Sequence, residues 1–109
     1  MPADKANIYD NIPNNLPDEL IQTLCRGGGT RIERIISRGH ESPEDFWYDQ
    51  ENDEWVIILR GGAVLEFEHG RQVQMRPGDY MNIPAHTRHR VVSTDSHNDT
   101  VWLAVHYNL

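Results

Sequence analysis

Two histidines and one glutamate stand out in this sequence because their side chains suit acid–base or metal chemistry. His86 and His89 are separated by two residues at the expected entrance of a strand, so their rings can converge on one point. Glu54 opens an otherwise apolar segment, where a buried carboxylate is costly unless a cation or a hydrogen-bond donor satisfies it. A metal or acid–base site is one interpretation. The structural alternative is a Glu54 open to water, a His86 on the surface and a His89 that only forms a hydrogen bond.

Two turns are predicted to position these histidines. Pro77-Gly78 fits the central pair of a type II turn, because proline presets φ and glycine accepts a positive φ. Residues 80–83 then supply a short strand, and Pro84-Ala85-His86 turns the chain again. His86 and His89 are therefore expected to lie close together.

Tyr48 is a further candidate for the same chemistry. It follows Trp47 in a segment that we interpret as a strand, so only one of the two side chains faces inward. If that residue is Tyr48, its hydroxyl near Glu54 could donate a proton or bind a ligand. The remaining histidines are interpreted as solvated or structural residues: His40, His69, His97 and His106.

The elements that must position these residues are short strands. From Thr30 onward, apolar residues alternate or form short runs bounded by glycine, proline and acidic turns, which is typical of strands. Residues 54–60 are nearly continuously apolar, as in a strand buried on both faces. This pattern predicts an all-β fold, an antiparallel sandwich or barrel of about eight strands. The predicted strands are residues 30–37, 46–50, 54–60, 63–68, 71–75, 80–83, 88–93 and 101–107.

The amino-terminal segment, residues 1–29, is predicted to be an arm followed by a short helix. Residues 1–15 are mostly polar and rich in turn formers. Pro17 suits the first turn of a helix, and Gly27-Gly28-Gly29 would end it. Residues 30–109 then form the barrel, so the chain is expected to be one domain. The apolar face of the helix would consist of Leu20, Ile21 and Leu24.

Composition narrows the class of partners. The 109 residues carry a net charge of −7, which opposes binding to phosphate backbones or anionic lipid, so we expect neither nucleic acid nor membrane as a partner. No apolar run is long enough to span a membrane, and no signal peptide is recognisable. The single Cys25 cannot form an intramolecular disulfide, which favours a reducing compartment. These features predict a cytoplasmic protein.

From about Gly39 to Tyr107 the sequence resembles the cupin superfamily, which consists of small jelly-roll barrels with a two-part motif. The second part reads glycine, five residues, proline, one residue, glycine, two residues, histidine. Gly78, Pro84 and His89 match it, with His86 in place of the second glycine. The first part ends in glutamate, six residues and glycine, and Glu54 with Gly61 matches it. The resemblance implies an antiparallel jelly-roll β-barrel.

The resemblance also implies a metal site, with one departure. Metal-binding cupins usually carry a His-x-His pair shortly before the glutamate, and this chain has Trp47-x-Asp49 or Tyr48-x-Gln50 there. Of the usual four ligands, only Glu54 and His89 carry over. His86 is the best candidate for a third, giving a two-histidine, one-carboxylate set for a divalent ion such as zinc, iron, manganese or nickel. Donors of lower rank are Asp49, Gln50, Tyr48, His40 and His106.

Two functions remain open at this point. The first is a metal-dependent small-molecule enzyme or binding protein that uses Glu54, His86 and His89. The second is a metal-free barrel that binds or senses a small polar molecule without catalysis. A fold does not choose between catalysis and binding, so the reaction type is left open. A homodimer is expected, because edge strands of such sheets invite pairing and relatives of this fold commonly pair through them.

Overall fold

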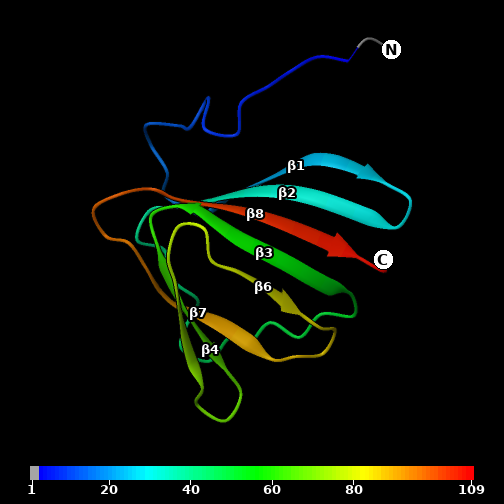
Figure 1. Ribbon diagram of the computed structural model, residues 1–109. Coiled ribbons are helices and arrows are strands. Elements are labelled where there is room, and N and C mark those ends of the chain that lie inside the picture. The colour runs from blue at the N-terminus through cyan, green and yellow to red at the C-terminus, as the bar shows by residue number, and fades with distance from the viewer. Residues whose placement is uncertain (1–2) are drawn as a thin grey trace.

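A computed structural model describes residues 3–109, and in that part of the chain every regular element is a strand. All the strand pairs are antiparallel, as Figure 1 shows. The predicted all-β antiparallel fold is therefore confirmed. The strands are β1 (Leu20–Gly27), β2 (Thr30–Ser37), β3 (Asp53–Arg60), β4 (Ala63–Phe67), β5 (Gln72–Met75), β6 (Tyr80–Ile83), β7 (His89–Thr94) and β8 (Thr100–Tyr107).

The strands form two sheets with the core between them. One sheet has the order β1-β2-β8-β3-β6, and the other has the order β5-β4-β7. Alternation along β3 buries Glu54, Val56 and Ile58 and leaves Trp55 and Ile57 half-buried, so only one face of this strand is fully covered. The core cluster takes residues from both sheets: Val56, Ile58, Ala63, Leu65, Phe67, Met75, Ile83, Trp102 and Ala104.

The prediction of a short amino-terminal helix was wrong. The segment forms β1, which pairs with β2 from Leu20 opposite Ile36 to Gly27 opposite Thr30. Gly28 and Gly29 have φ values of 58° and 75°, and two successive positive φ values suit a two-residue hairpin turn rather than a helix end. A bulge between Thr23 and Cys25 interrupts the strict alternation of the strand. Because of this interruption, Leu20, Ile21 and Leu24 have a spacing that resembles one face of a helix.

The other strand predictions agree with the structure except at one place. Residues 46–50 form no regular strand and make only an isolated bridge between Tyr48 and His89. Two backbone hydrogen bonds close this bridge, from Tyr48 N to His89 O at 2.7 Å and from His89 N to Tyr48 O at 3.1 Å. The loop before β3 is thus fixed to the start of β7.

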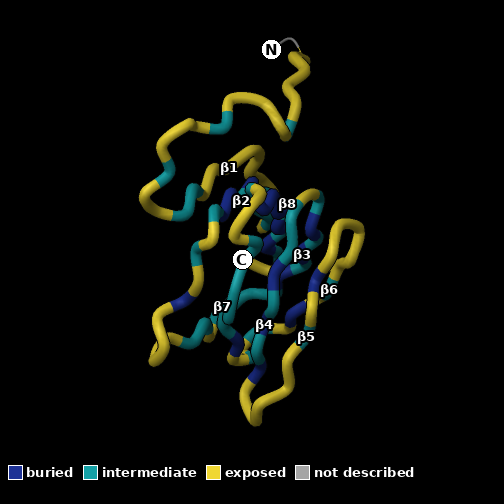
Figure 2. Tube along the Cα trace, turned by 90° about the vertical axis from the view of Figure 1, so that its left-hand side faces the viewer, coloured by how far each residue is buried: buried dark blue, intermediate teal, exposed yellow. Residues whose placement is uncertain are grey.

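The amino-terminal arm is tied to β2 of the large sheet through its backbone oxygens. The guanidinium of Arg34 donates to the carbonyl oxygens of Ile8 and Asp10, at 2.9 and 2.6 Å. Figure 2 shows that β1 is largely exposed, whereas the strands beside it are buried over much of their length. The boundary predicted at residue 30 falls in the β1–β2 hairpin. Within residues 3–109 no helix has the length and apolar character needed to cross a membrane.

Candidate functional site

Glu54 and His89 meet inside the barrel. Glu54 is near the start of β3 in the large sheet, and His89 begins β7 in the small sheet. Their exposed fractions are 8 % and 5 %, and His89 Nε2 lies 3.8 Å from Glu54 Oε1. A carboxylate from one sheet and an imidazole from the other therefore share one buried location.

Local structure explains how the sequence brings these two residues together. The turn at Pro77-Gly78 forms as predicted, with Gly78 at φ 93° and Asp79 N donating to Arg76 O at 2.9 Å. It sends β6 antiparallel to β3, where Ile83 lies opposite Glu54. The loop after β6 then delivers the chain to His89.

The hydrogen bonds of His89 fix which of its nitrogens faces the cavity. Its Nδ1 lies 2.8 Å from the carbonyl oxygen of Thr87, and only a protonated Nδ1 can donate to that oxygen. Among the described residues, Nε2 has no hydrogen-bond partner, because Glu54 is too distant. The ring of Tyr48 stacks on the imidazole with centroids 5.3 Å apart. His89 thus presents Nε2 as a base or a ligand.

A second buried pair lies beside the first. His106 Nε2 is 3.0 Å from Glu33 Oε1 and 3.9 Å from Glu54 Oε2. Asn52 Nδ2 donates to Asp53 O at 3.0 Å and lies 3.1 Å from His106 Nδ1, so Nδ1 accepts and Nε2 carries the proton. A neutral His106 that donates to Glu33 follows from this geometry.

These groups line a cavity of about 310 Å³ between the two sheets. Apolar side chains form part of its wall, and nine of its sixteen lining residues add polar or charged groups. Its more exposed side is formed by Ile21 of β1 and Arg31 of β2. The lining residues are Glu19, Ile21, Arg31, Glu33, Ile35, Tyr48, Gln50, Asn52, Glu54, Val56, Leu65, Ile83, His89, Val91, Trp102 and His106.

The bridge to His89 decides which side chains of residues 47–50 face the cavity. Tyr48 and Gln50 line it, and Gln50 Nε2 donates weakly to Glu54 Oε1 at 3.4 Å. Trp47 lies instead beneath Arg88 and Arg90, whose guanidinium carbons are 5.6 and 6.0 Å from its ring centroid. Tyr48 and Gln50, rather than Trp47 and Asp49, therefore stand on the inner face next to the glutamate.

Burial raises the pKa of the Tyr48 hydroxyl above its ordinary value, and the carboxylates of Glu19 and Glu54 raise it further. A phenolate is disfavoured in this setting, so Tyr48 remains protonated. It can donate a hydrogen bond or a proton into the cavity.

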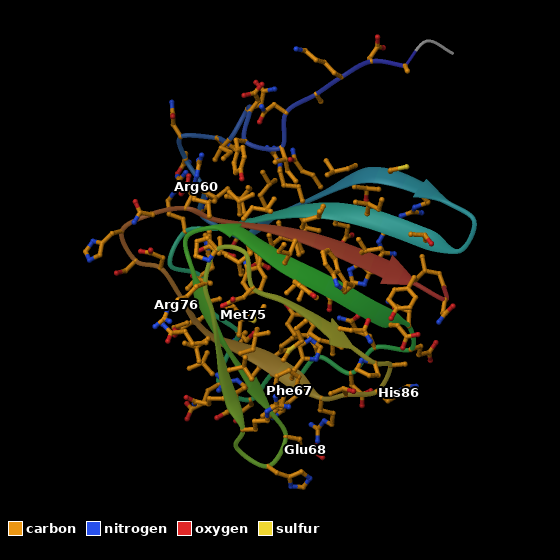
Figure 3. The ribbon with its side chains drawn as sticks, in the orientation of Figure 1. Arg60, Phe67, Glu68, Met75, Arg76 and His86 are labelled. Atoms are coloured by element: carbon orange, nitrogen blue, oxygen red, sulfur yellow. The ribbon has the colours of Figure 1, made fainter. Side chains whose placement is uncertain are left out.

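The structure places His86 away from the cavity. Its Nδ1 pairs with Asp49 Oδ1 at 2.9 Å, and 65 % of its side chain is exposed. Figure 3 shows it on the loop that joins β6 to β7, at the outside of the molecule. His86 has φ 61°, which explains why a glycine suits this position of the motif. Of the predicted set Glu54, His86 and His89, the structure brings together the first and last, and the metal assignment stays a prediction.

Four lining residues with polar side chains were missed from the sequence: Glu19, Arg31, Glu33 and Asn52. A signal was available for Glu33. It lies two residues from Ile35, so in a strand the two side chains share one face, and Ile35 was a candidate for burial. Glu19 and Asn52 lie outside regular alternation, so no pattern pointed to them.

Comparisons with known proteins agree with this fold. The family model described as Cupin domain matches residues 34–106. The chain belongs to the cupin family. A putative mannose-6-phosphate isomerase from Ralstonia eutropha JMP134 is 46 % identical, with a TM-score of 0.93, over 98 % of this chain and 100 % of that one. No curated protein matches.

Two more distant structures share the fold alone. A cupin superfamily protein from Desulfitobacterium hafniense DCB-2 is 18 % identical, with a TM-score of 0.76, over 98 % of this cupin and 94 % of that chain. A conserved protein of unknown function from Streptococcus pyogenes is 17 % identical, with a TM-score of 0.75, over 100 % of this cupin and 90 % of that chain.

The donor set in the cavity does not fit a resident metal of the usual cupin kind. Tyr48 and Gln50 supply a protonated phenol and an amide, and the proton on His106 Nε2 is directed to Glu33. In residues 3–109 no group of three or more histidine, cysteine, aspartate or glutamate side chains is arranged to hold a metal ion. Glu54 and His89 are two donors, whereas resident zinc or iron sites take three or four.

Proposed function

We propose that this cupin binds a small polar molecule in the cavity between its sheets, with Glu54 and His89 as the polar centre. The observation that carries the proposal is the unpartnered Nε2 of His89, which faces the cavity from a residue only 5 % exposed. This nitrogen is open to the cavity rather than sealed in the core, so a ligand hydroxyl can donate a hydrogen bond to it.

The same groups support proton transfer. His89 Nε2 carries a lone pair and can act as a general base, and Tyr48 remains protonated and can act as a general acid. Both line the cavity together with Glu54. An isomerisation that moves a proton between neighbouring carbons needs such a pair. The name of the Ralstonia relative belongs to that class of reaction, so we include catalysis by His89 and Tyr48 in the proposal.

To test the proposal, we would use NMR to measure the binding of a panel of neutral, cationic and anionic polar molecules. The reporter is the indole N–H of Trp102, which lines the cavity and donates to Ser37 Oγ at 3.1 Å. We expect at least one probe to shift this signal in the wild type. His89→Ala and Glu54→Gln should weaken the response, whereas the exposed controls His97→Ala and Glu44→Gln should not. A panel in which no probe shifts the signal would refute the proposed function.

A second candidate function is binding of the predicted divalent metal ion, and one observation favours it. The Nδ1–H of His89 donates to a backbone carbonyl, as metal-binding histidines usually do with their second nitrogen. Glu54 and His89 would hold such an ion only with donors from the bound molecule, because His86 pairs with Asp49. Elemental analysis of protein purified without a histidine tag tests this. Under this candidate, metal should be retained and should fall in both Glu54→Gln and His89→Ala.

The wider setting is proposed from the sequence. The charge of −7 and the single cysteine favour a cytoplasmic protein without nucleic-acid or membrane partners. A homodimer is part of the same proposal.

A further inference from the structure

The charges around the cavity bear on which molecules it can hold. Three carboxylates line it, from Glu19, Glu33 and Glu54. Among the lining residues that the structure describes, Arg31 is the single arginine or lysine, and its Nε lies 2.9 Å from Glu33 Oε2. Glu33 therefore offsets the charge of this arginine through Nε, while its Nη1 and Nη2 groups could still contact a ligand.

The two histidines do not reverse this balance. His106 is neutral, because Asn52 donates to its Nδ1 and its Nε2 donates to Glu33. His89 adds one positive charge at most, if Nε2 is also protonated. The lining stays net negative in either state, inside walls of low dielectric that strengthen the repulsion of an anion.

Besides the remaining N–H groups of Arg31, the cavity offers hydrogen-bond acceptors on carboxylates and on one imidazole. Within residues 3–109, Glu54 receives only the long contact from Gln50, and Glu19 receives one donor, Ser37 Oγ at 2.8 Å. His89, itself more than nine-tenths buried, directs an unpartnered nitrogen into the same space. A ligand that satisfies these atoms must bring hydrogen-bond donors, which sugar hydroxyls supply without charge, while apolar residues such as Val56 and Leu65 would cover its carbon skeleton.

We propose, on the basis of the proposed function, that the cavity selects a neutral, hydroxyl-rich molecule of monosaccharide size and rejects its phosphate ester. The volume of about 310 Å³ lies at the small end of the range for ligand pockets, roughly 300–1,000 Å³. The substrate class would then differ from the phosphorylated sugar in the name of the Ralstonia relative.

The experiment compares mannose with mannose 6-phosphate, a pair that differs only in the phosphate. Affinities for the full-length protein are measured by the Trp102 indole signal at several salt concentrations. We expect mannose to bind about tenfold tighter than its phosphate ester or better. Because salt screens charge repulsion, the difference should shrink as ionic strength rises.

Two variants separate charge from fit. Glu19→Gln removes one carboxylate at nearly constant shape and should narrow the preference for mannose, whereas exposed Glu44→Gln should leave it unchanged. Arg31→Gln removes the guanidinium: if the ester were held by Arg31, its affinity would collapse in this variant.

The possible outcomes are distinct. Equal or tighter binding of mannose 6-phosphate, competition by inorganic phosphate, or loss of ester binding in Arg31→Gln would overturn the inference. So would binding of neither sugar when another probe of the panel occupies the cavity. If no probe of any charge binds, the proposed function itself fails.

Discussion

At the scale of single residues, the two ligand positions that carried over from the family motif, Glu54 and His89, also met in space. Glu54 and His89 could be predicted because motif spacing reports which strand positions face the barrel interior. His86 could not be placed in this way, since three residues of sequence separation do not fix the direction of a side chain that follows a turn. Its positive φ and its pairing with Asp49 direct it outward.

Tyr48 gives a prediction at this scale that concerns pH. Its pKa is raised, chiefly by burial and then by Glu19 and Glu54, so the folded state favours the protonated phenol. The stability gained in this way is complete below the unfolded pKa of 10.0 and is lost as pH rises through the folded pKa. As pH rises above about 10, the free energy of unfolding of Tyr48→Phe should therefore fall less steeply than that of the wild type.

Absorbance titration of tyrosinate provides the direct measurement for this prediction. The chain has four tyrosines, and the last to ionise in the wild type should be absent from the Tyr48→Phe curve. Loss of an early step instead would show that Tyr48 is not shielded by burial.

At the scale of elements, hydrophobic alternation predicted most strands, and contacts distant in sequence decided the exceptions. Residues 30–37 were bounded correctly because charge and apolarity alternate there. β1 was mistaken for a helix because its structure depends on pairing with β2, which local propensity does not encode. The 46–50 segment depends in the same way on its bridge to His89.

The turn between β3 and β4 provides a stability prediction. A Cβ on Gly61 would lie 2.5 Å from Thr100 Oγ1 and 2.7 Å from backbone atoms, and its φ is 81°. Gly70 has a similar φ of 86° but open space around it. Both alanine variants carry the cost of a positive φ, but only Gly61→Ala adds a steric clash. Gly61→Ala should therefore be less stable than Gly70→Ala by about 1–3 kcal/mol.

Urea unfolding of the two variants measures this difference. Equal stabilities would mean that β8 moves aside without cost, contrary to the close contact at Thr100.

At the scale of the whole molecule, the proposed homodimer depends on which edges remain open. β1 is an eight-residue edge strand with Leu24 half exposed, and long apolar edges favour pairing with another chain. We expect wild-type protein to sediment at twice the chain mass. Leu24→Lys should shift it toward the monomer, with His97→Lys in the exposed loop before β8 as the control. A monomeric wild type at high concentration would contradict the proposal.

The inward placement of Tyr48 and Gln50 has a consequence for engineering. These two side chains occupy the cavity wall beside Glu54 and His89, where the family resemblance implies a His-x-His pair. Exchanging both for histidine should create a chelating centre without redesign of the scaffold. We expect the Tyr48→His, Gln50→His double variant to take up nickel or zinc tightly enough to raise its melting temperature, while Trp47→His, Asp49→His does not. Two substitutions in the native barrel would then be enough to create a metal-binding protein.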